Sequence, residues 1–87
     1  VVFEFSESDV VVGGLGAHSD VWSLTQEAAA KSGLLLESTD TSLGVYLTTI
    51  NGTSDSGWEY FINGERGTVS VDRALIDDTV VLRWRLV

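Results

Sequence analysis

Alternating apolar and polar positions near the amino terminus predict two short strands. Val1, Phe3 and Phe5 fall on one face of residues 1–5, which is the period of a strand with one buried face. Residues 10–12 are a second, β-branched run, and a glycine-rich segment ends it. The pattern fits either a β-hairpin or a strand followed by a loop.

Spacing, capping and composition predict a helix over residues 20–32. Three apolar residues recur at helical spacing on one face: Val21, Leu24 and Ala28. The segment is rich in alanine, which has the highest intrinsic helix propensity. Ser19 or Asp20 supplies the N-cap side chain, and Gly33 supplies a left-handed C-terminal stop.

After Gly33 the pattern becomes that of strands. Residues 34–37 form a short apolar run, and residues 38–42 are all polar, which predicts a turn or loop. Segments rich in β-branched and aromatic residues predict further strands over residues 44–50, 58–62 and 80–87. Asn63 and Gly64 predict a tight turn after the second of these strands.

This order of elements predicts a single domain over residues 1–87 of the α+β class. One helix packed on a mixed β-sheet, in a β-grasp-like layout, accounts for every periodic segment. The predicted core consists of the helical stripe and the inward faces of the first and last strands: Phe3, Phe5, Val21, Leu24, Ala28, Val80, Leu82 and Trp84. Arg83 and Arg85 share the opposite face of the last strand, where we expect them to pair with carboxylates.

Composition narrows the class of partner. The 87 residues include 13 acidic and 5 basic side chains, for a net charge of −8. This balance argues against nucleic acid and against anionic membrane surfaces. No apolar run approaches the roughly 20 residues that span a bilayer. The chain has no methionine and starts at Val1, so we expect a processed form or a domain of a longer protein.

The sequence offers little for catalysis. The chain has no cysteine and a single histidine, His18, which excludes thiolate and His-based zinc sites and disfavours a Ser-His-Asp triad. His18 lies in a glycine-flanked loop, where we expect it to be exposed and without a partner. The acidic segments near Asp40 and Asp55 lack the alternating order of a calcium loop. We therefore predict no catalytic residue, no metal site and no enzymatic activity.

An ordered series of motifs in the second half of the chain is the basis of a family resemblance. The series is Ser42-Leu43-Gly44, then Asn51-Gly52, then Gly57-Trp58-Glu59-Tyr60-Phe61-Ile62-Asn63-Gly64, and finally residues 75–81 with Trp84. Together with the helix, these motifs resemble the transcobalamin-like C-terminal domain family over about residues 20–86. They also resemble the C-terminal β-domains of intrinsic factor and transcobalamin. The chain has Asp77-Asp78-Thr79 where the family usually has Asp-Gly-Asp, and Leu43 where intrinsic factor has an aromatic residue.

The resemblance implies a non-enzymatic binding module that contributes one half of a cobalamin or related small-ligand site within a larger exported protein. It implies an extracellular or cell-surface location and cobalamin as the candidate bound ligand, and no cofactor is predicted beyond that. The alternative hypothesis is an accessory protein-interaction or structural domain of a cell-surface protein. In that case the partner is another protein domain, and there is no small ligand.

Strand geometry gives a prediction for where a ligand would bind. If the strands at 44–50 and 58–62 pair as an antiparallel hairpin, the start of the first lies beside the end of the second. That pairing predicts a rim formed by Ser42, Leu43, Gly44, Asn63 and Gly64, together with part of residues 65–69. Trp58 would then lie at the opposite end and act mainly as a core residue.

Overall fold

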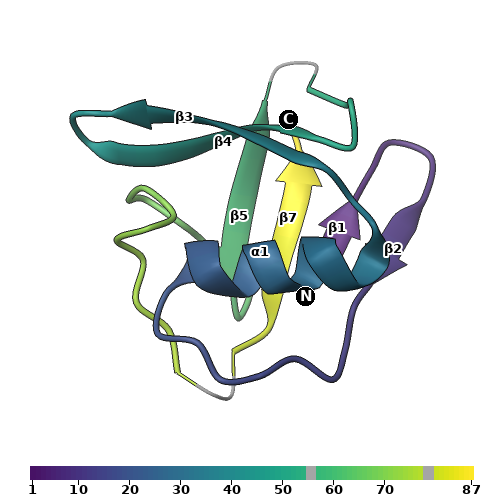
Figure 1. Cartoon of the computed structure of the whole chain (residues 1–87), viewed down its shortest axis with the longest axis horizontal. Coiled ribbons are helices and arrows are strands. Elements are labelled where there is room, and N and C mark those ends of the chain that lie inside the picture. Colours follow the sequence, from purple (N-terminus) through teal and green to yellow (C-terminus); the bar gives the residue numbers. More distant parts are fainter. Residues whose placement is uncertain (55–56, 78–79) are drawn as a thin grey trace.

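The order of elements along the chain is the one that the sequence predicts, with two additional strands. One strand, at Leu36–Thr41, precedes residues 44–62, and the other, at Glu65–Arg66, follows them. The computed structural model describes residues 1–54, 57–77 and 80–87, so the Asp78-Thr79 part of the closing motif lies outside the described residues. The elements are β1 (Val2–Glu4), β2 (Asp9–Val11), α1 (Val21–Ser32), β3 (Leu36–Thr41), β4 (Gly44–Ile50), β5 (Trp58–Ile62), β6 (Glu65–Arg66) and β7 (Leu82–Leu86). Figure 1 shows α1 crossing one face of the main sheet.

The main sheet has the strand order β2-β1-β7-β5-β6. β1 and β2 form an antiparallel hairpin, and β5 pairs antiparallel with both β6 and β7. β1 pairs parallel with β7, so the first and last strands lie side by side within the sheet. The sheet is therefore mixed, and the predicted α+β class with one helix on a mixed sheet is confirmed.

The helix begins and ends where its capping residues predict. The Asp20 side chain accepts a hydrogen bond from the backbone N–H of Ser23 at 2.8 Å, and Gly33 adopts a left-handed conformation with φ 73°. Five helical residues are buried toward the sheet: Val21, Leu24, Thr25, Ala28 and Ala29. The apolar stripe therefore faces the sheet as expected, and a threonine shares it.

The core lies between α1 and the main sheet. Six of the predicted core residues are buried: Phe3, Val21, Leu24, Ala28, Leu82 and Trp84. Phe5 and Val80 are only partly buried and pack against the edge of this cluster. The indole N–H of Trp84 donates to the Thr25 hydroxyl at 3.0 Å, and that hydroxyl donates to the Val21 carbonyl at 2.7 Å. Sheet and helix are thus joined by a buried polar contact as well as by apolar packing.

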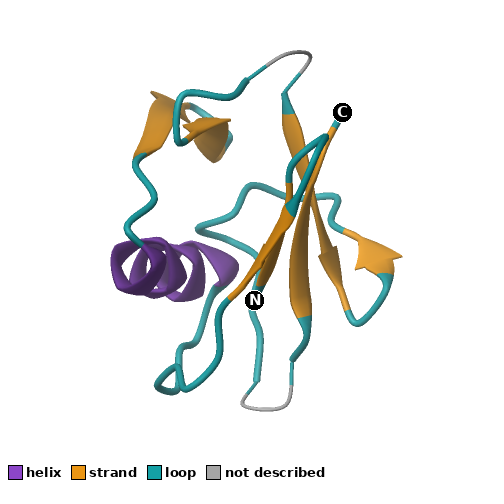
Figure 2. Cartoon of the chain, turned by 90° about the vertical axis from the view of Figure 1, so that its right-hand side faces the viewer, coloured by secondary structure: helices purple, strands orange, loops and turns teal. Residues whose placement is uncertain are grey.

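The prediction for residues 38–50 was wrong in two respects. Residues 38–41 are not a loop but continue β3, and β4 pairs with β3 instead of with β5. β3 and β4 form a separate two-stranded sheet, which lies on the same side of the main sheet as α1 (Figure 2). β3 was missed because it has no buried face beyond Leu36, so no apolar alternation marks it.

The Asn63–Gly64 turn, in contrast, is confirmed. Asn63 and Gly64 have φ values of 51° and 87° and connect the paired residues Ile62 and Glu65. Positive φ at both central positions is the requirement of the two-residue hairpin turn that the Asn-Gly pair favours.

Charged side chains on the outer face of the main sheet pair as predicted. Arg83 and Arg85 both approach Glu4, at N–O distances of 3.0 and 3.6 Å. The register explains this convergence, because Glu4 of β1 lies opposite Arg85 of β7. Within the described residues, no helix has the length and apolarity required to cross a bilayer.

His18 is not the exposed, unpartnered residue that the sequence predicts. Its side chain is only 22% exposed, and Nε2 lies 2.8 Å from Oε1 of Glu27 in α1. The backbone N–H of Gly16 donates to the same carboxylate at 2.9 Å, because the loop before α1 folds back along the helix. The hydrogen bond from His18, followed by that from Gly16, lowers the pKa of Glu27.

Candidate functional site

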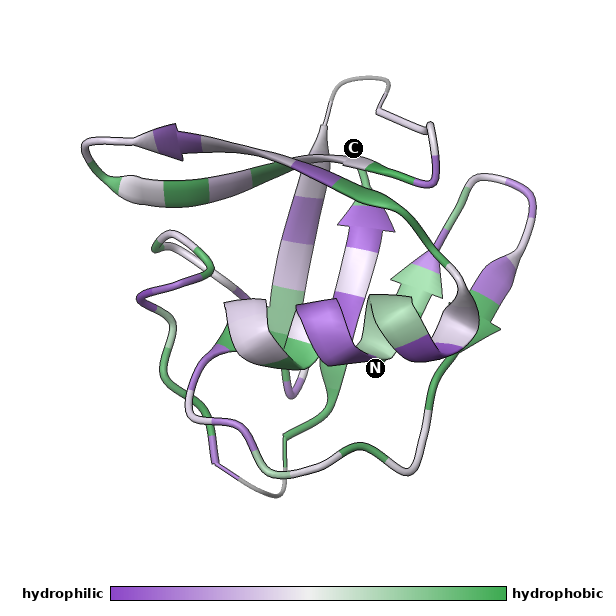
Figure 3. Ribbon diagram, in the orientation of Figure 1, coloured by the Kyte–Doolittle hydropathy of each residue, from purple (hydrophilic) through white to green (hydrophobic). Residues whose placement is uncertain are grey.

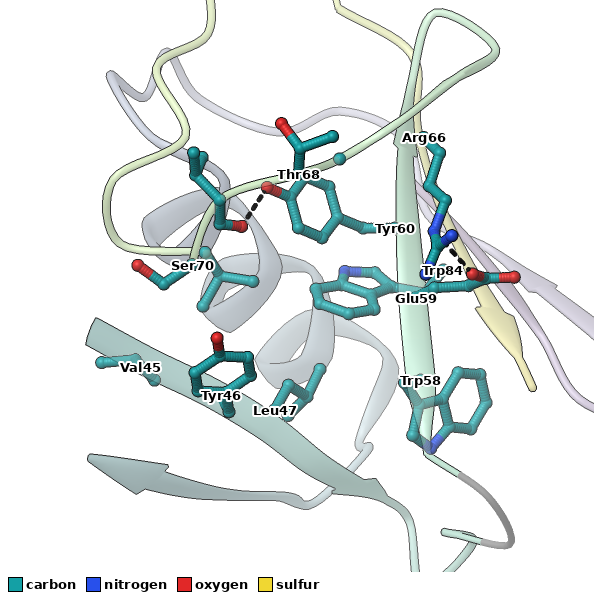
Figure 4. Close-up of a pocket in the computed structure, with 13 residues that line it drawn as sticks. Val45, Tyr46, Leu47, Trp58, Glu59, Tyr60, Arg66, Thr68, Ser70 and Trp84 are labelled. Atoms are coloured by element: carbon teal, nitrogen blue, oxygen red, sulfur yellow. Dashed lines mark hydrogen bonds and ion pairs between the residues drawn. The ribbon is translucent and has the colours of Figure 1, made fainter. Parts of the chain in front are cut away.

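A cleft of about 420 Å³ separates the β3–β4 hairpin from the main sheet. Residues 45–47 of β4 form one wall, residues 58–60 of β5 form the other, and residues 66–71 close one end. Figure 4 shows the side chains from these segments arranged around a common space, with α1 behind it. Its volume lies within the range of about 300–1,000 Å³ typical of small-ligand pockets.

Aromatic side chains form much of the cleft lining. Tyr60 and Trp84 are directly opposite each other on β5 and β7, with ring centroids 5.5 Å apart, and both are buried. Tyr46 lines the other wall and is 48% exposed. Trp58 is half-buried, packs edge-on against Phe5 at 5.2 Å, and its ring lies at the other end of the β5 wall (Figure 4). Accessible aromatic surface is therefore provided by Tyr46 on the β4 wall and by Trp58 at one end of the β5 wall.

The loop after β6 folds over Tyr60. The Gly67 N–H donates to the Tyr60 carbonyl at 2.8 Å, and the Tyr60 hydroxyl donates to the Val69 carbonyl. A Cβ atom at position 67 would collide with the Tyr60 ring, so glycine is required for this approach. Burial raises the pKa of the Tyr60 phenol above its ordinary value, and the protonated hydroxyl is the hydrogen-bond donor in this contact.

The β3–β4 turn is held against residues 70–72 by three features. The Ser70 hydroxyl donates to the Leu43 carbonyl at 2.7 Å, and the Val45 N–H donates to Oδ1 of Asp72 at 2.9 Å. Gly44 lies between them with φ 122°, and a Cβ there would collide with Ser70 and Asp72. The Val45 N–H, with a smaller contribution from the Ser70 hydroxyl, lowers the pKa of Asp72. These contacts set the width of the cleft at this end.

The charged groups of the cleft neutralise each other. Nε of Arg66 lies 2.9 Å from Oε2 of Glu59, and Arg66 is 71% exposed at the rim. An exposed pair of this kind contributes little to stability, so the arginine can exchange partners at low cost. Among the described residues there is no group of three or more side chains able to hold a metal ion.

The structure separates the residues that were predicted to form one rim. Ser42, Leu43 and Gly44 lie at the β3–β4 turn, whereas Asn63 and Gly64 lie in the β5–β6 turn at the far end of β5 (Figure 1). The premise that β4 pairs with β5 is therefore wrong, although the later part of residues 65–69 does line the cleft. The Asn63 side chain is instead used structurally, because its Oδ1 accepts a hydrogen bond from the Val81 N–H at 2.8 Å.

Sequence reasoning missed most of the cleft lining. Trp58 and Tyr60 alternate along β5, and this alternation signals a shared face, but nothing local to the sequence shows that β4 lies across from it. Tyr46 lies in the strand predicted at residues 44–50, close to the predicted rim, but it was not among the predicted site residues. The available signal was the pair of glycines at 44 and 67, since each marks a close approach of two segments.

Comparisons with known proteins identify no similar protein. The chain matches no family model, no curated protein and no solved structure. The case for the cleft as a binding site therefore rests on its own geometry.

Proposed function

We propose that the chain is a non-enzymatic binding domain and that the cleft between β4 and β5 is its ligand-contact surface. The observation that carries this proposal is a cleft of about 420 Å³ with aromatic side chains on both walls. Such surfaces bind flat or apolar ligands by burying their faces. In the described lining, the single carboxylate pairs with Arg66 and the Tyr60 hydroxyl is bonded to a carbonyl, an arrangement that supports binding over catalysis.

The expected ligand is cobalamin or a related molecule, on the basis of the resemblance to the transcobalamin-like family. Cobalamin is much larger than the cleft, which would cover only part of it. This size supports the hypothesis that the chain supplies one half of a site within a larger extracellular or cell-surface protein. We further propose a β-grasp-like layout, which the β2-β1-β7-β5-β6 order and the crossing helix support.

Titration of the chain with cobalamin tests this proposal. Binding is expected to quench tryptophan fluorescence and to change the corrin absorption spectrum, because the cleft contains Trp58 and Trp84. Tyr46→Ala should weaken binding, since this half-exposed ring contributes one wall. Val11→Ala is the matched control, because Val11 is 75% exposed on β2, outside the cleft lining.

A second variant distinguishes ligand binding in the cleft from ligand binding at the rim that the sequence predicts. Leu43 is 64% exposed at the β3–β4 turn, so Leu43→Asp should leave the fold intact. Loss of binding in this variant with no effect of Tyr46→Ala would place the ligand on the turn. Absence of any spectral change at millimolar cobalamin would contradict the proposal for this chain in isolation.

A further inference from the structure

The outer edge of β3 is a longer open strand edge than either edge of the main sheet. β3 has six residues and pairs only with β4, whereas the edge strands of the main sheet, β2 and β6, have three and two residues. Five of the six β3 residues are exposed, and β3 is polar beyond Leu36 (Figure 3). Natural proteins usually shorten or block such edges, because unpaired backbone groups there accept another strand.

Backbone groups on this edge point away from β4. The Val45 N–H donates to Asp72, so it points away from β3. Asp40 is the β3 residue opposite Val45, and in an antiparallel pair such partners direct their backbone groups outward on both sides. Ser38, two residues earlier, has the same orientation because β3 is regular from Ser38 to Thr41. The edge thus offers N–H and C=O groups at two positions with strand spacing.

Charge on the same edge selects the partner. β3 has two acidic residues, Glu37 and Asp40, and no basic one, and both carboxylates are exposed without an ion pair to any described cation. If two copies paired antiparallel through all six residues, Glu37 of one copy would lie opposite Asp40 of the other. Like charges directly opposite each other destabilise a strand pair, so self-association through this edge is disfavoured.

We propose that the β3 edge binds an extended segment of a partner protein by antiparallel strand addition. Full pairing requires that the segment have two lysines or arginines three positions apart, opposite Glu37 and Asp40. Backbone hydrogen bonds to Ser38 and Asp40 provide the affinity, and the two charge pairs provide the specificity. The β3 edge and the cleft lie on opposite edges of the hairpin, so this interaction is independent of ligand binding in the cleft.

Amide NMR spectroscopy with a synthetic peptide tests the proposal. The probe is the hexapeptide Val-Lys-Thr-Thr-Lys-Val with blocked ends, which places its lysines opposite the two carboxylates. The amides of Ser38 and Asp40 are expected to shift on titration and to exchange more slowly with solvent. A peptide with glutamate in place of both lysines, and one N-methylated at the bonding amides, should each bind at least about tenfold more weakly.

Charge variants of the protein distinguish local pairing from general attraction to an acidic domain. The double variant Glu37→Lys, Asp40→Lys should bind the lysine peptide about tenfold more weakly than the native chain does. Glu7→Lys combined with Asp9→Lys makes the same change in net charge at exposed positions near β2 and should leave affinity unchanged. Equal weakening by both pairs, shifts centred outside β3, or concentration-dependent dimerisation through β3 would each overturn the proposal.

Discussion

The buried hydrogen bond between Trp84 and Thr25 makes Thr25→Val an informative perturbation. The exposed fractions of these side chains are 1% and 0%, and the indole N–H donates to the threonine hydroxyl at 3.0 Å. Valine preserves the shape of the side chain but removes the acceptor. The Val21 carbonyl keeps its helical backbone partner, so the indole N–H is the group that loses its bond.

The expected cost follows from leaving one buried donor unsatisfied, which is about 1–3 kcal/mol. A domain of 87 residues has a total stability on the order of 4–13 kcal/mol, so the variant should still fold. Each kcal/mol lost should lower the melting temperature by about 4–8 °C. Urea denaturation followed by far-UV circular dichroism measures the free energy of unfolding directly.

A double-mutant cycle tests the cause of this cost. Trp84→Phe removes the N–H, so Thr25→Val should cost less in that background than in the native chain. Equal costs in the two backgrounds would show that the indole N–H is not the affected group. A native-background variant as stable as the original chain would refute the reasoning altogether.

The remaining predictions concern the core, the hairpin and the charges. Leu82→Ala should cost about 2–5 kcal/mol in urea denaturation, because this residue is fully buried, and an unchanged melting temperature would contradict its place in the core. Gly44→Ala should lower the free energy of unfolding by about 1–3 kcal/mol more than Gly52→Ala does. Both glycines have positive φ, but only at Gly44 would a Cβ collide with Asp72. Equal shifts in melting temperature for the two variants would count against the close approach. Acid should destabilise the fold, because the pKa values of the Glu27 and Asp72 carboxyls are lower in the folded chain than in the unfolded chain, where they are about 4. The stability that these carboxylates contribute is present above the unfolded pKa values and is lost as the pH falls through the folded ones. Urea midpoints measured between pH 6 and pH 2 check this. Stability should rise between low and moderate sodium chloride, because screening over about 10 Å at 0.1 M relieves repulsion at a net charge of −8; a flat or falling midpoint would refute this.

The elements that could be predicted from sequence are those whose signals are local. Asp20 and Gly33 mark the ends of the helix because capping depends on residues within one turn of each end. The Asn63–Gly64 turn was predictable because positive φ at two successive positions is rarely satisfied by other residue pairs. The class of fold followed from the order of these elements.

The candidate site was not predictable, because it depends on which strands pair. β3 and β5 are equally available in sequence as partners for β4, and choosing β5 misplaced the rim. The sequence of β3 predicts a loop because an exposed edge strand has no buried face and therefore no period of two. The contact of His18 with Glu27 was hidden for a similar reason: it depends on how the preceding loop folds back, and glycines leave that path open.

The parallel pair of β1 and β7 has a mechanical consequence. Val2, Phe3 and Glu4 pair with Arg83, Trp84 and Arg85, and the two ends of the chain lie toward opposite ends of this pair (Figure 1). Tension applied through residues 1 and 87 pulls the two strands in opposite directions along their length, so the hydrogen bonds between them are sheared together instead of being peeled apart one at a time. Forced unfolding is governed by the unfolding rate, and this geometry raises the barrier to it. A longer protein that contained this domain between two anchored segments would therefore transmit load through the centre of its sheet.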